Sequence, residues 1–359
     1  TSLKRTGFMN IGIICEFNPF HAGHAHLIKS VKSAGDKIIC IMSGNFVQRG
    51  EFAVYDKFTR AKTALENGAD LVIELPPEQA LLSAEGFATS AVKLAESLGI
   101  IDEIAFGAEN ADTAELKKIA ELLKDPKVQG EISREMKSGI SYPAARNKII
   151  KSPLLEKPNN ILAIEYIKVA SIPCRAITRI GKGHDTDDEK YSASAIRKTL
   201  SPDEISTMQN CEKAVLFKLR SMSKEGFAKI ADVNEGLENR IYEAARNAAS
   251  LDELYALIKS KRYTLSRVKR IVLRAFLDIY GSETDVPAIR ILGFNENGRA
   301  LLADIKAKCD KPIISRLADC DGDLRKYYLT QCAHTDAHSL GYKKTLPCGA
   351  EQRSKIIVI

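Results

Sequence analysis

Short apolar runs alternate with amphipathic segments through the first half of the chain. The runs, which have the length and composition of buried strands, are residues 11–14, 37–42, 70–75, 103–106 and 175–180. Segments with helical spacing lie between them, at residues 25–31, 57–67, 83–98 and 114–123. Strands that alternate with helices predict a parallel sheet with helices on both faces. We therefore predict an α/β fold whose ligands bind beyond the carboxyl ends of the strands.

Helical spacing dominates the second half of the chain. Helices are expected over residues 203–222, 236–249, 251–260 and 264–280, the last with Gly281 as its C-cap. We therefore expect a nucleotide-binding α/β domain over residues 9–205 and a mainly helical, basic region over residues 206–359. Residues 1–8 precede Met9 and are interpreted as an expression remnant.

Composition places the chain among globular proteins without a membrane span. It has 359 residues, of which 45% are hydrophobic and 28% charged, and a net charge of +7. No apolar run approaches the roughly 20 residues of a membrane helix. The eight cysteines form no C-x-x-C pair and no signal peptide is visible, so we expect a reduced, cytoplasmic protein.

The first chemical motif follows the first predicted strand. Residues 15–24 read CEFNPFHAGH and precede a helical segment. Strand, tight loop and helix start form a geometry that presents backbone N–H groups to an anion. His21 and His24 add two donors for phosphates, and Gly23 permits close approach of a ligand. The pattern is the H-x-G-H signature of the nucleotidyltransferase superfamily.

A second motif follows the last strand of the α/β domain. Residues 191–198 read YSASAIRK, which resembles the superfamily pattern I-S-S-T-x-x-R. A serine at the start of a helix, its free N–H groups and an arginine one turn later suit a triphosphate. Arg197 and Lys198 would hold the β- and γ-phosphates. Because the pattern departs from the fuller form, Ser192 is less securely assigned than Arg197.

Adenylyl transfer is the chemistry that these residues favour. Attack on the α-phosphate of ATP builds negative charge, so the protein must supply donors and cations rather than a nucleophile. We predict His21, His24 and Arg197 as catalytic residues. We expect Mg²⁺ to accompany ATP, held largely by phosphates and water.

Longer stretches narrow the resemblance to one family. They read CEFNPFHAGH (15–24), MSGNFVQRGE (42–51), LVIELP (71–76), FGAEN (106–110) and KPNNIL (157–162), in this order. The chain resembles the bacterial tRNA(Met) cytidine acetate ligase family, densely over residues 9–200 and thinly to about residue 270. The resemblance implies a Rossmann-like nucleotidyltransferase domain. It also implies activation of acetate to acetyl-adenylate and acetylation of N4 of the wobble cytidine of elongator tRNA(Met).

The resemblance also implies an ATP site. Its expected residues are Ile14, Cys15, Glu16, Phe17, Asn18, Pro19, Phe20, His21, Ala22, Gly23, His24, Ala25, His26, Leu27, Gly107, Asn160, Arg179 and Ile180, with Ser194 and Arg197 from the second motif. Asn159 is the alternative to Asn160.

Several residues near these motifs have two interpretations. Arg49 either holds acetate, adenylate or a phosphate, or pairs with Glu51 or Asp56. Glu16 either tunes the two histidines or fixes the turn. His26 and His184 either face the ligand or are solvated.

Basic residues are concentrated in the second half of the chain. Residues 240–275 contain nine basic and three acidic side chains. A cluster of this kind is typical of a nucleic-acid partner, and otherwise of a solvated helix face. Since the resemblance implies a tRNA substrate, we expect backbone contacts from Lys261, Arg262, Arg267, Lys269, Arg270 and Arg274.

No metal site or protein partner is expected. The spacing of Cys332, His334, His338 and Cys348 fits no common zinc class. The sequence leaves two rival functions: a small-molecule adenylyltransferase of the same fold, and a non-catalytic RNA-binding protein.

Overall fold

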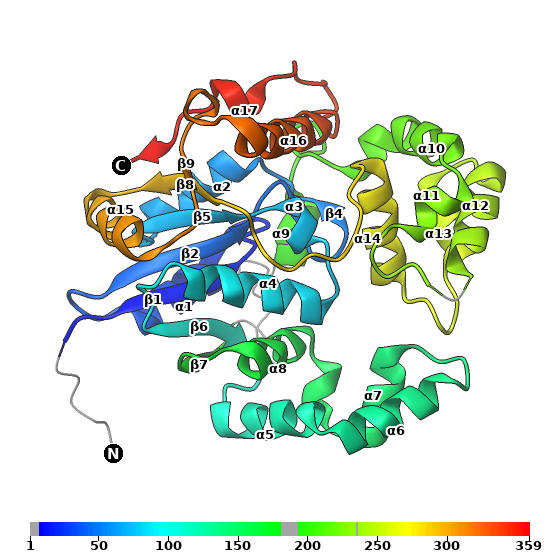
Figure 1. The fold of residues 1–359 in the computed structure, drawn as a ribbon, viewed down its shortest axis with the longest axis horizontal. Coiled ribbons are helices and arrows are strands. Elements are labelled where there is room, and N and C mark those ends of the chain that lie inside the picture. The colour runs from blue at the N-terminus through cyan, green and yellow to red at the C-terminus, as the bar shows by residue number, and fades with distance from the viewer. Residues whose placement is uncertain (1–6, 181–192, 235) are drawn as a thin grey trace.

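A single large sheet forms the centre of the computed structural model, which describes residues 7–180, 193–234 and 236–359 (Figure 1). Its strand order is β10-β8-β5-β2-β1-β6-β7, with β9 paired to β8. The parallel strands are β1 (Asn10–Cys15), β2 (Lys37–Ser43), β5 (Leu71–Leu75), β6 (Glu103–Ala108) and β7 (Cys174–Thr178). The five predicted strands and the α/β fold are therefore confirmed.

Both faces of the sheet are buried, which explains why its strands have continuous apolar runs. In β2, Ile38 and Cys40 pack into one core and Ile39 into the other. Helices α1 (Ala22–Val31) and α2 (Lys57–Glu66) contribute to the first core. Helices α4 (Ala84–Ser97), α5 (Thr113–Lys124) and α8 (Pro158–Val169) contribute to the second.

Three short segments connect these elements. Helix α3 (Pro77–Ala80) follows β5. Helices α6 (Pro126–Met136) and α7 (Tyr142–Ile150) lead through a 3₁₀ turn to α8. Strands β3 (Phe46–Val47) and β4 (Glu51–Phe52) form an antiparallel hairpin directly after β2.

A helical region with its own core lies to one side of the sheet (Figure 1). Its helices are α10 (Glu212–Ser221), α11 (Lys224–Ala228), α12 (Leu237–Asn247), α13 (Leu251–Ile258) and α14 (Leu265–Phe276), preceded by α9 (Ala193–Thr199). Phe46 and Phe52 of the β3–β4 hairpin belong to the same core. The mainly helical character of this region is confirmed. Its core also includes part of the hairpin that directly follows β2, at the carboxyl end of that strand.

Two predicted helix boundaries are wrong. Residues 203–207 are not helical, because Ser206 N and Thr207 N donate to the carbonyls of Val54 and Gly341. Helix α14 ends at Phe276 rather than near residue 280, so Gly281 is not its C-cap. Gly281 N donates instead to Lys229 O. Hydrogen bonds to residues that are distant in the sequence therefore determine both helix boundaries.

The chain then returns to the sheet. Strand β8 (Ile289–Phe294) lies antiparallel to β5, and β9 (Ile313–Ile314) and β10 (Ile357–Val358) lie parallel to β8. Helices α15 (Glu296–Lys308), α16 (Gly322–Ser339) and α17 (Ala350–Arg353) connect them. The predicted boundary at residue 205 remains a prediction. The mainly helical later part also contributes three strands to the large sheet.

The described residues contain no membrane-spanning helix and no disulfide bond. Every helix in the described ranges is too short or too polar to cross a lipid bilayer. All eight cysteines, each within those ranges, are free thiols.

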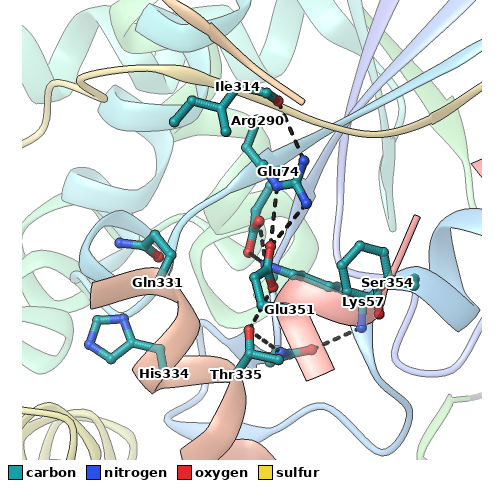
Figure 2. A network of polar contacts seen from close by, with 12 residues as sticks. Lys57, Glu74, Arg290, Ile314, Gln331, His334, Thr335, Glu351 and Ser354 are labelled. Atoms are coloured by element: carbon teal, nitrogen blue, oxygen red, sulfur yellow. Dashed lines mark hydrogen bonds and ion pairs between the residues drawn. The ribbon is translucent and has the colours of Figure 1, made fainter. Parts of the chain in front are cut away.

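A buried network of charges fastens the returning segment to the sheet (Figure 2). Lys57 Nζ lies 2.6 Å from Glu74 Oε2 and 2.8 Å from Glu351 Oε2. Arg290 Nη2 lies 3.1 Å from Glu351 Oε1, and Thr335 donates to the other oxygen at 2.8 Å. Lys57 is 1% exposed and Glu74 3%, so neither charge is shared with solvent. The network joins α2 and β5 to β8, α16 and α17.

We expect Lys57→Met to destabilise the protein strongly, because it leaves the buried Glu74 carboxylate without its ion-pair partner and Glu351 with Arg290 alone. The expected loss in free energy of unfolding is about 3–5 kcal/mol. Lys62→Met on the same helix is the control, because the Lys62–Glu66 pair is exposed and should change stability by less than about 0.5 kcal/mol. Urea titration of both variants measures the difference, and equal losses would contradict this account of the network.

Candidate active site

The histidine loop begins helix α1 with a reciprocal cap. His21 is the N-cap residue, and its Nδ1 accepts from Gly23 N at 3.0 Å. His24 Nδ1 accepts from His21 N at 3.3 Å. The two rings stack with their centroids 3.7 Å apart. The histidines therefore take the place that Ser and Glu occupy in an ordinary capping box.

These caps assign the tautomer of both rings. A nitrogen that accepts a backbone N–H carries no proton, so the proton of each neutral imidazole is on Nε2. Burial, followed by the charges of Arg179 and Arg197, lowers the pKa of His21 to about 4. Burial, followed by His21 and Arg179, lowers the pKa of His24 well below its usual value. At neutral pH the loop thus holds two uncharged Nε2–H donors.

Aromatic packing fixes the loop that precedes the histidines. Phe17 has a left-handed φ of 46°, which is strained for a bulky residue. Its buried ring packs edge-on against Phe20 and His24, with both centroid distances 4.9 Å. Asn18 Oδ1 accepts from Val54 N at 2.8 Å. The loop is thus packed against the β4–α2 connection.

The second motif reaches this loop from 179 residues further along the chain. Arg197, in helix α9, donates from Nη1 to Asn18 O at 2.7 Å. It also adds to the positive field that acts on His21. The structure therefore brings two of the predicted catalytic side chains, His21 and Arg197, to the same loop, with His24 stacked on His21. Tyr191, Ser192 and His184 lie outside the described residues, and the side chain of Ser194 is not described.

Arg60, a buried arginine that the sequence motifs did not identify, binds backbone carbonyls at the carboxyl ends of β1 and β2. Arg60 is 1% exposed and donates from Nη1 to Glu16 O at 2.6 Å and to Ser43 O at 3.0 Å. It also donates to the carbonyls of Gly44 and, at 3.0 Å, Tyr55. These carbonyls follow β1, β2 and β4. Arg60 thus positions the histidine loop and the β2 loop together, and no local sequence signal identifies such a role.

Glu16 fixes the turn. Its Oε1 accepts from Gln48 N at 2.7 Å and from Ser43 Oγ at 3.3 Å. Burial raises the pKa of this carboxyl, although both hydrogen bonds oppose the shift. Among the described contacts, its carboxylate is bound to the β2 loop and the β3–β4 turn rather than to either histidine. Of the two interpretations, the structure supports the structural one.

The remaining expected ATP residues beyond the loop line the β6–β7 side. A Cβ on Gly107 would lie 3.3 Å from Arg179 Cγ, so a side chain there would press on the arginine. Arg179 Nη1 donates to Asn159 Oδ1 at 3.3 Å. Asn160 is buried, and its Oδ1 accepts from Asn110 N at 3.0 Å. Ile180 follows Arg179 and is half-buried. Asn160 therefore shapes the loop after β6, whereas Asn159 touches the charged side chain.

The expected residues at the two ends of the loop are part of the fold. Ile14, Cys15 and Leu27 belong to the cores on either face of the sheet. Ala22 is exposed, and Ala25 is half-buried. His26 lies one helical turn from Ser30, with Nε2 at 3.3 Å from its hydroxyl. The bond between Asn18 and Pro19 is cis. Contact of these residues with ATP remains a prediction.

The predicted basic face of α14 is mostly engaged within the protein. Arg270 and Arg274 are 7% and 1% exposed, so the expectation that they lie on an open helix face is wrong. Arg274 donates to Glu78 O at 2.8 Å and to Gly281 O at 2.6 Å. Arg270 lies 3.6 Å from Asp232. Both guanidinium groups are structural contacts between the helical region and its neighbours.

Two further members of the predicted set also have partners. Arg267 donates to Asp232 O and Asn234 Oδ1, and Lys269 pairs with Glu51 at 2.7 Å. Arg262 is half-buried, and Lys261 is exposed. The sequence pattern therefore identified a basic segment correctly but not which of its cations face outward.

The two histidines near the end of the chain lie against backbone carbonyls. His334 Nε2 lies 3.1 Å from Leu277 O, and His338 Nε2 lies 2.7 Å from Ala53 O. Cys332 is buried and Cys348 is exposed. Among the described residues, no three His, Cys, Asp or Glu side chains gather as a metal site.

Comparisons with known proteins agree with this arrangement. A family model described as "HIGH Nucleotidyl Transferase" matches residues 9–215 and 202–353. The tRNA(Met) cytidine acetate ligase of Acetivibrio thermocellus is 36% identical, over 97% of this chain and 99% of that protein. Its counterpart in a Thermoanaerobacter species is 39% identical, over 95% and 97%.

Solved structures show the same fold. The crystal structure of Thermotoga maritima TmcAL bound with alpha-thio ATP has a TM-score of 0.83 and 29% identity. The apo form I of the same protein has a TM-score of 0.87 and 28% identity. Both comparisons cover 98% of this chain and 100% of the solved one.

The doubly wound sheet, the His-x-Gly-His loop at the start of α1 and the arginine brought to it define a nucleotidyltransferase of the HIGH class. Within that class, the chain belongs to the tRNA(Met) cytidine acetate ligase family.

We expect His24→Asn and His24→Gln to separate the capping role of Nδ1 from the donor role of Nε2–H. Asn retains an acceptor near the Nδ1 position but has no donor at Nε2, whereas Gln places a donor there. The Asn variant should lose about 10²–10³-fold in the rate of adenylate formation, and the Gln variant should lose less. Thermal unfolding of both variants is the control, and equal rates in the two variants would contradict the assigned Nε2–H role.

Proposed function

We propose that the protein activates acetate with ATP and transfers the acetyl group to N4 of the wobble cytidine of elongator tRNA(Met), in the cytoplasm. The observation that carries the proposal is the contact between Arg197 and the histidine loop, which unites the two phosphate-binding motifs. The names of the relatives, tRNA(Met) cytidine acetate ligase, give the substrates that it assigns.

In the first step, a carboxylate oxygen of acetate attacks the α-phosphorus of ATP. The bond from that phosphorus to the bridging oxygen of pyrophosphate breaks, which leaves acetyl-adenylate and pyrophosphate. His21 and His24 donate their Nε2–H groups to phosphate oxygens, and Arg197 supplies positive charge. Because the donors are neutral and fixed by backbone hydrogen bonds, they need little reorganisation as charge develops.

In the second step, the exocyclic amine of cytidine attacks the acetyl carbon of the mixed anhydride. AMP leaves with the electrons of the anhydride bond, and the amine loses one proton to solvent. Mg²⁺ bound together with ATP would offset negative charge on the phosphates, and it would be held largely by phosphate oxygens and water. That arrangement suits the described residues, among which the histidine loop offers donors rather than a carboxylate cage.

The tRNA contacts in this proposal come from cations that remain exposed. Lys259 and Lys261 are exposed in the turn that follows α13. Arg240, also exposed, donates to Lys259 O at 3.2 Å and so lies beside the same turn. Exposed, clustered cations suit the phosphate backbone of RNA, which attracts them without regard to sequence.

We expect exchange of labelled pyrophosphate into ATP to require acetate. The reverse of adenylate formation regenerates ATP only when acetyl-adenylate is present, so exchange without acetate should be at background level. Exchange that ignores acetate would contradict the ligase proposal and favour a different acceptor.

We expect Lys261→Ala to weaken binding of all tRNAs by a similar factor. Loss of one phosphate contact should reduce the slope of log K against log salt concentration by about 1. Lys118→Ala, an exposed lysine on α5, is the control and should leave both unchanged. Filter binding across a salt series measures this, and an unchanged slope in Lys261→Ala would exclude this lysine as a phosphate contact.

A further inference from the structure

Arg49 occupies a turn that is fixed on three sides. It lies between β3 and β4, where Gly50 N donates to Val47 O at 2.9 Å. Gln48 N, the neighbour of Arg49, donates to the Glu16 carboxylate at 2.7 Å. Gly50 has a φ of 75°, and a Cβ there would lie 2.4 Å from Arg270 N of α14. The turn therefore has little freedom to move relative to the histidine loop.

Arg49 is not paired with either of the acidic residues that neighbour it in the sequence. Glu51, one of its two possible partners in sequence, pairs with Lys269 at 2.7 Å. Asp56, the other, caps α2 through Phe58 N and Thr59 N. Arg49 is exposed, and within the described ranges its guanidinium makes no hydrogen bond or ion pair. Burial raises the pKa of the Glu16 carboxyl and the charge of Arg49 slightly opposes that shift, so the arginine lies near the end of the histidine loop. An exposed arginine in a fixed turn, without a hydrogen-bond partner among the described residues, is suited to a ligand.

The position of Arg49 in the fold suits a ligand other than ATP. In the sheet, β2 and β6 lie on opposite sides of β1. Gly107 and Arg179 follow β6 and β7 on one side, and Arg179 contributes to the field at both histidines. The hairpin that carries Arg49 follows β2 on the other side. In an in-line displacement the attacking group approaches phosphorus on the side opposite to the departing group. Because the attacking carboxylate and the phosphates are all negatively charged, a cation beside the carboxylate favours its approach.

We propose that Arg49 binds the carboxylate of acetate and presents it to the α-phosphate of ATP. A planar guanidinium matches a carboxylate with two parallel hydrogen bonds, which a lysine cannot provide. Glu16 and Gly50 are positioning residues, because they fix the turn from the histidine loop and from α14. The inference rests on the proposed function and adds the group that recognises the acceptor of the first step.

Pyrophosphate exchange at varied acetate and ATP concentrations tests the assignment. Arg49→Ala should raise the KM for acetate by about 10- to 100-fold, the effect of losing a charged hydrogen bond, and change the KM for ATP by less than about twofold. Arg49→Lys should give an intermediate KM for acetate and supplies the comparison if Ala is too slow to measure. Arg299→Ala, an exposed arginine on α15, should leave both constants unchanged.

Three outcomes would overturn the assignment of Arg49. They are an unchanged KM for acetate, a rise in the KM for ATP by the same factor, and a loss confined to tRNA affinity in filter binding. Failure of the proposed function gives a different result, because wild-type exchange would then ignore acetate before any variant is examined. Thermal unfolding of Arg49→Ala shows whether the exposed side chain affects folding.

Discussion

The site depends on one buried guanidinium. Arg60 donates to the carbonyls of Glu16, Ser43, Gly44 and Tyr55, which are the points where β1, β2 and the hairpin leave the sheet. Glu16 and Gly44 directly follow β1 and β2, and Ser43 is the last residue of β2. Because a buried carbonyl without a partner costs free energy, these bonds stabilise the points where both strands end. Arg60 therefore helps to hold the histidine loop and the loop after β2 in one arrangement.

In the proposed mechanism, the histidine loop acts through fixed hydrogen-bond donors rather than by acid–base chemistry. Backbone N–H groups occupy Nδ1 of both histidines, and burial with nearby arginines keeps the rings neutral. In the same proposal, the positive charges come from Arg179 and Arg197, which the fold brings from distant segments. The Lys57–Glu74–Glu351 network stabilises this arrangement, because it links β5 and α2 to the last helix of the chain. Helix α2 is also the helix that contains Arg60.

The local sequence pattern predicted those elements whose structure depends on neighbouring residues in the chain. The five parallel strands and the His21–His24 loop could be identified because apolar runs and motif spacing are short-range properties. The position of strand β8 in the sheet could not, because it pairs with β5 from more than 200 residues away. Arg270 and Arg274 of α14 were wrongly expected on an open helix face for the same reason. Arg274, for example, donates to the carbonyls of Glu78 and Gly281, which no helical pattern indicates. Arg60 was missed because its partners are backbone atoms.

The proposed function joins acetate activation and acetylation of tRNA in one chain. The most direct measurement is incubation of the protein with ATP, labelled acetate and elongator tRNA(Met), followed by digestion and nucleoside analysis. The account predicts label in N4-acetylcytidine at the wobble position, and none when ATP is omitted. Label that stays in a soluble adenylate, or that appears without ATP, would contradict it.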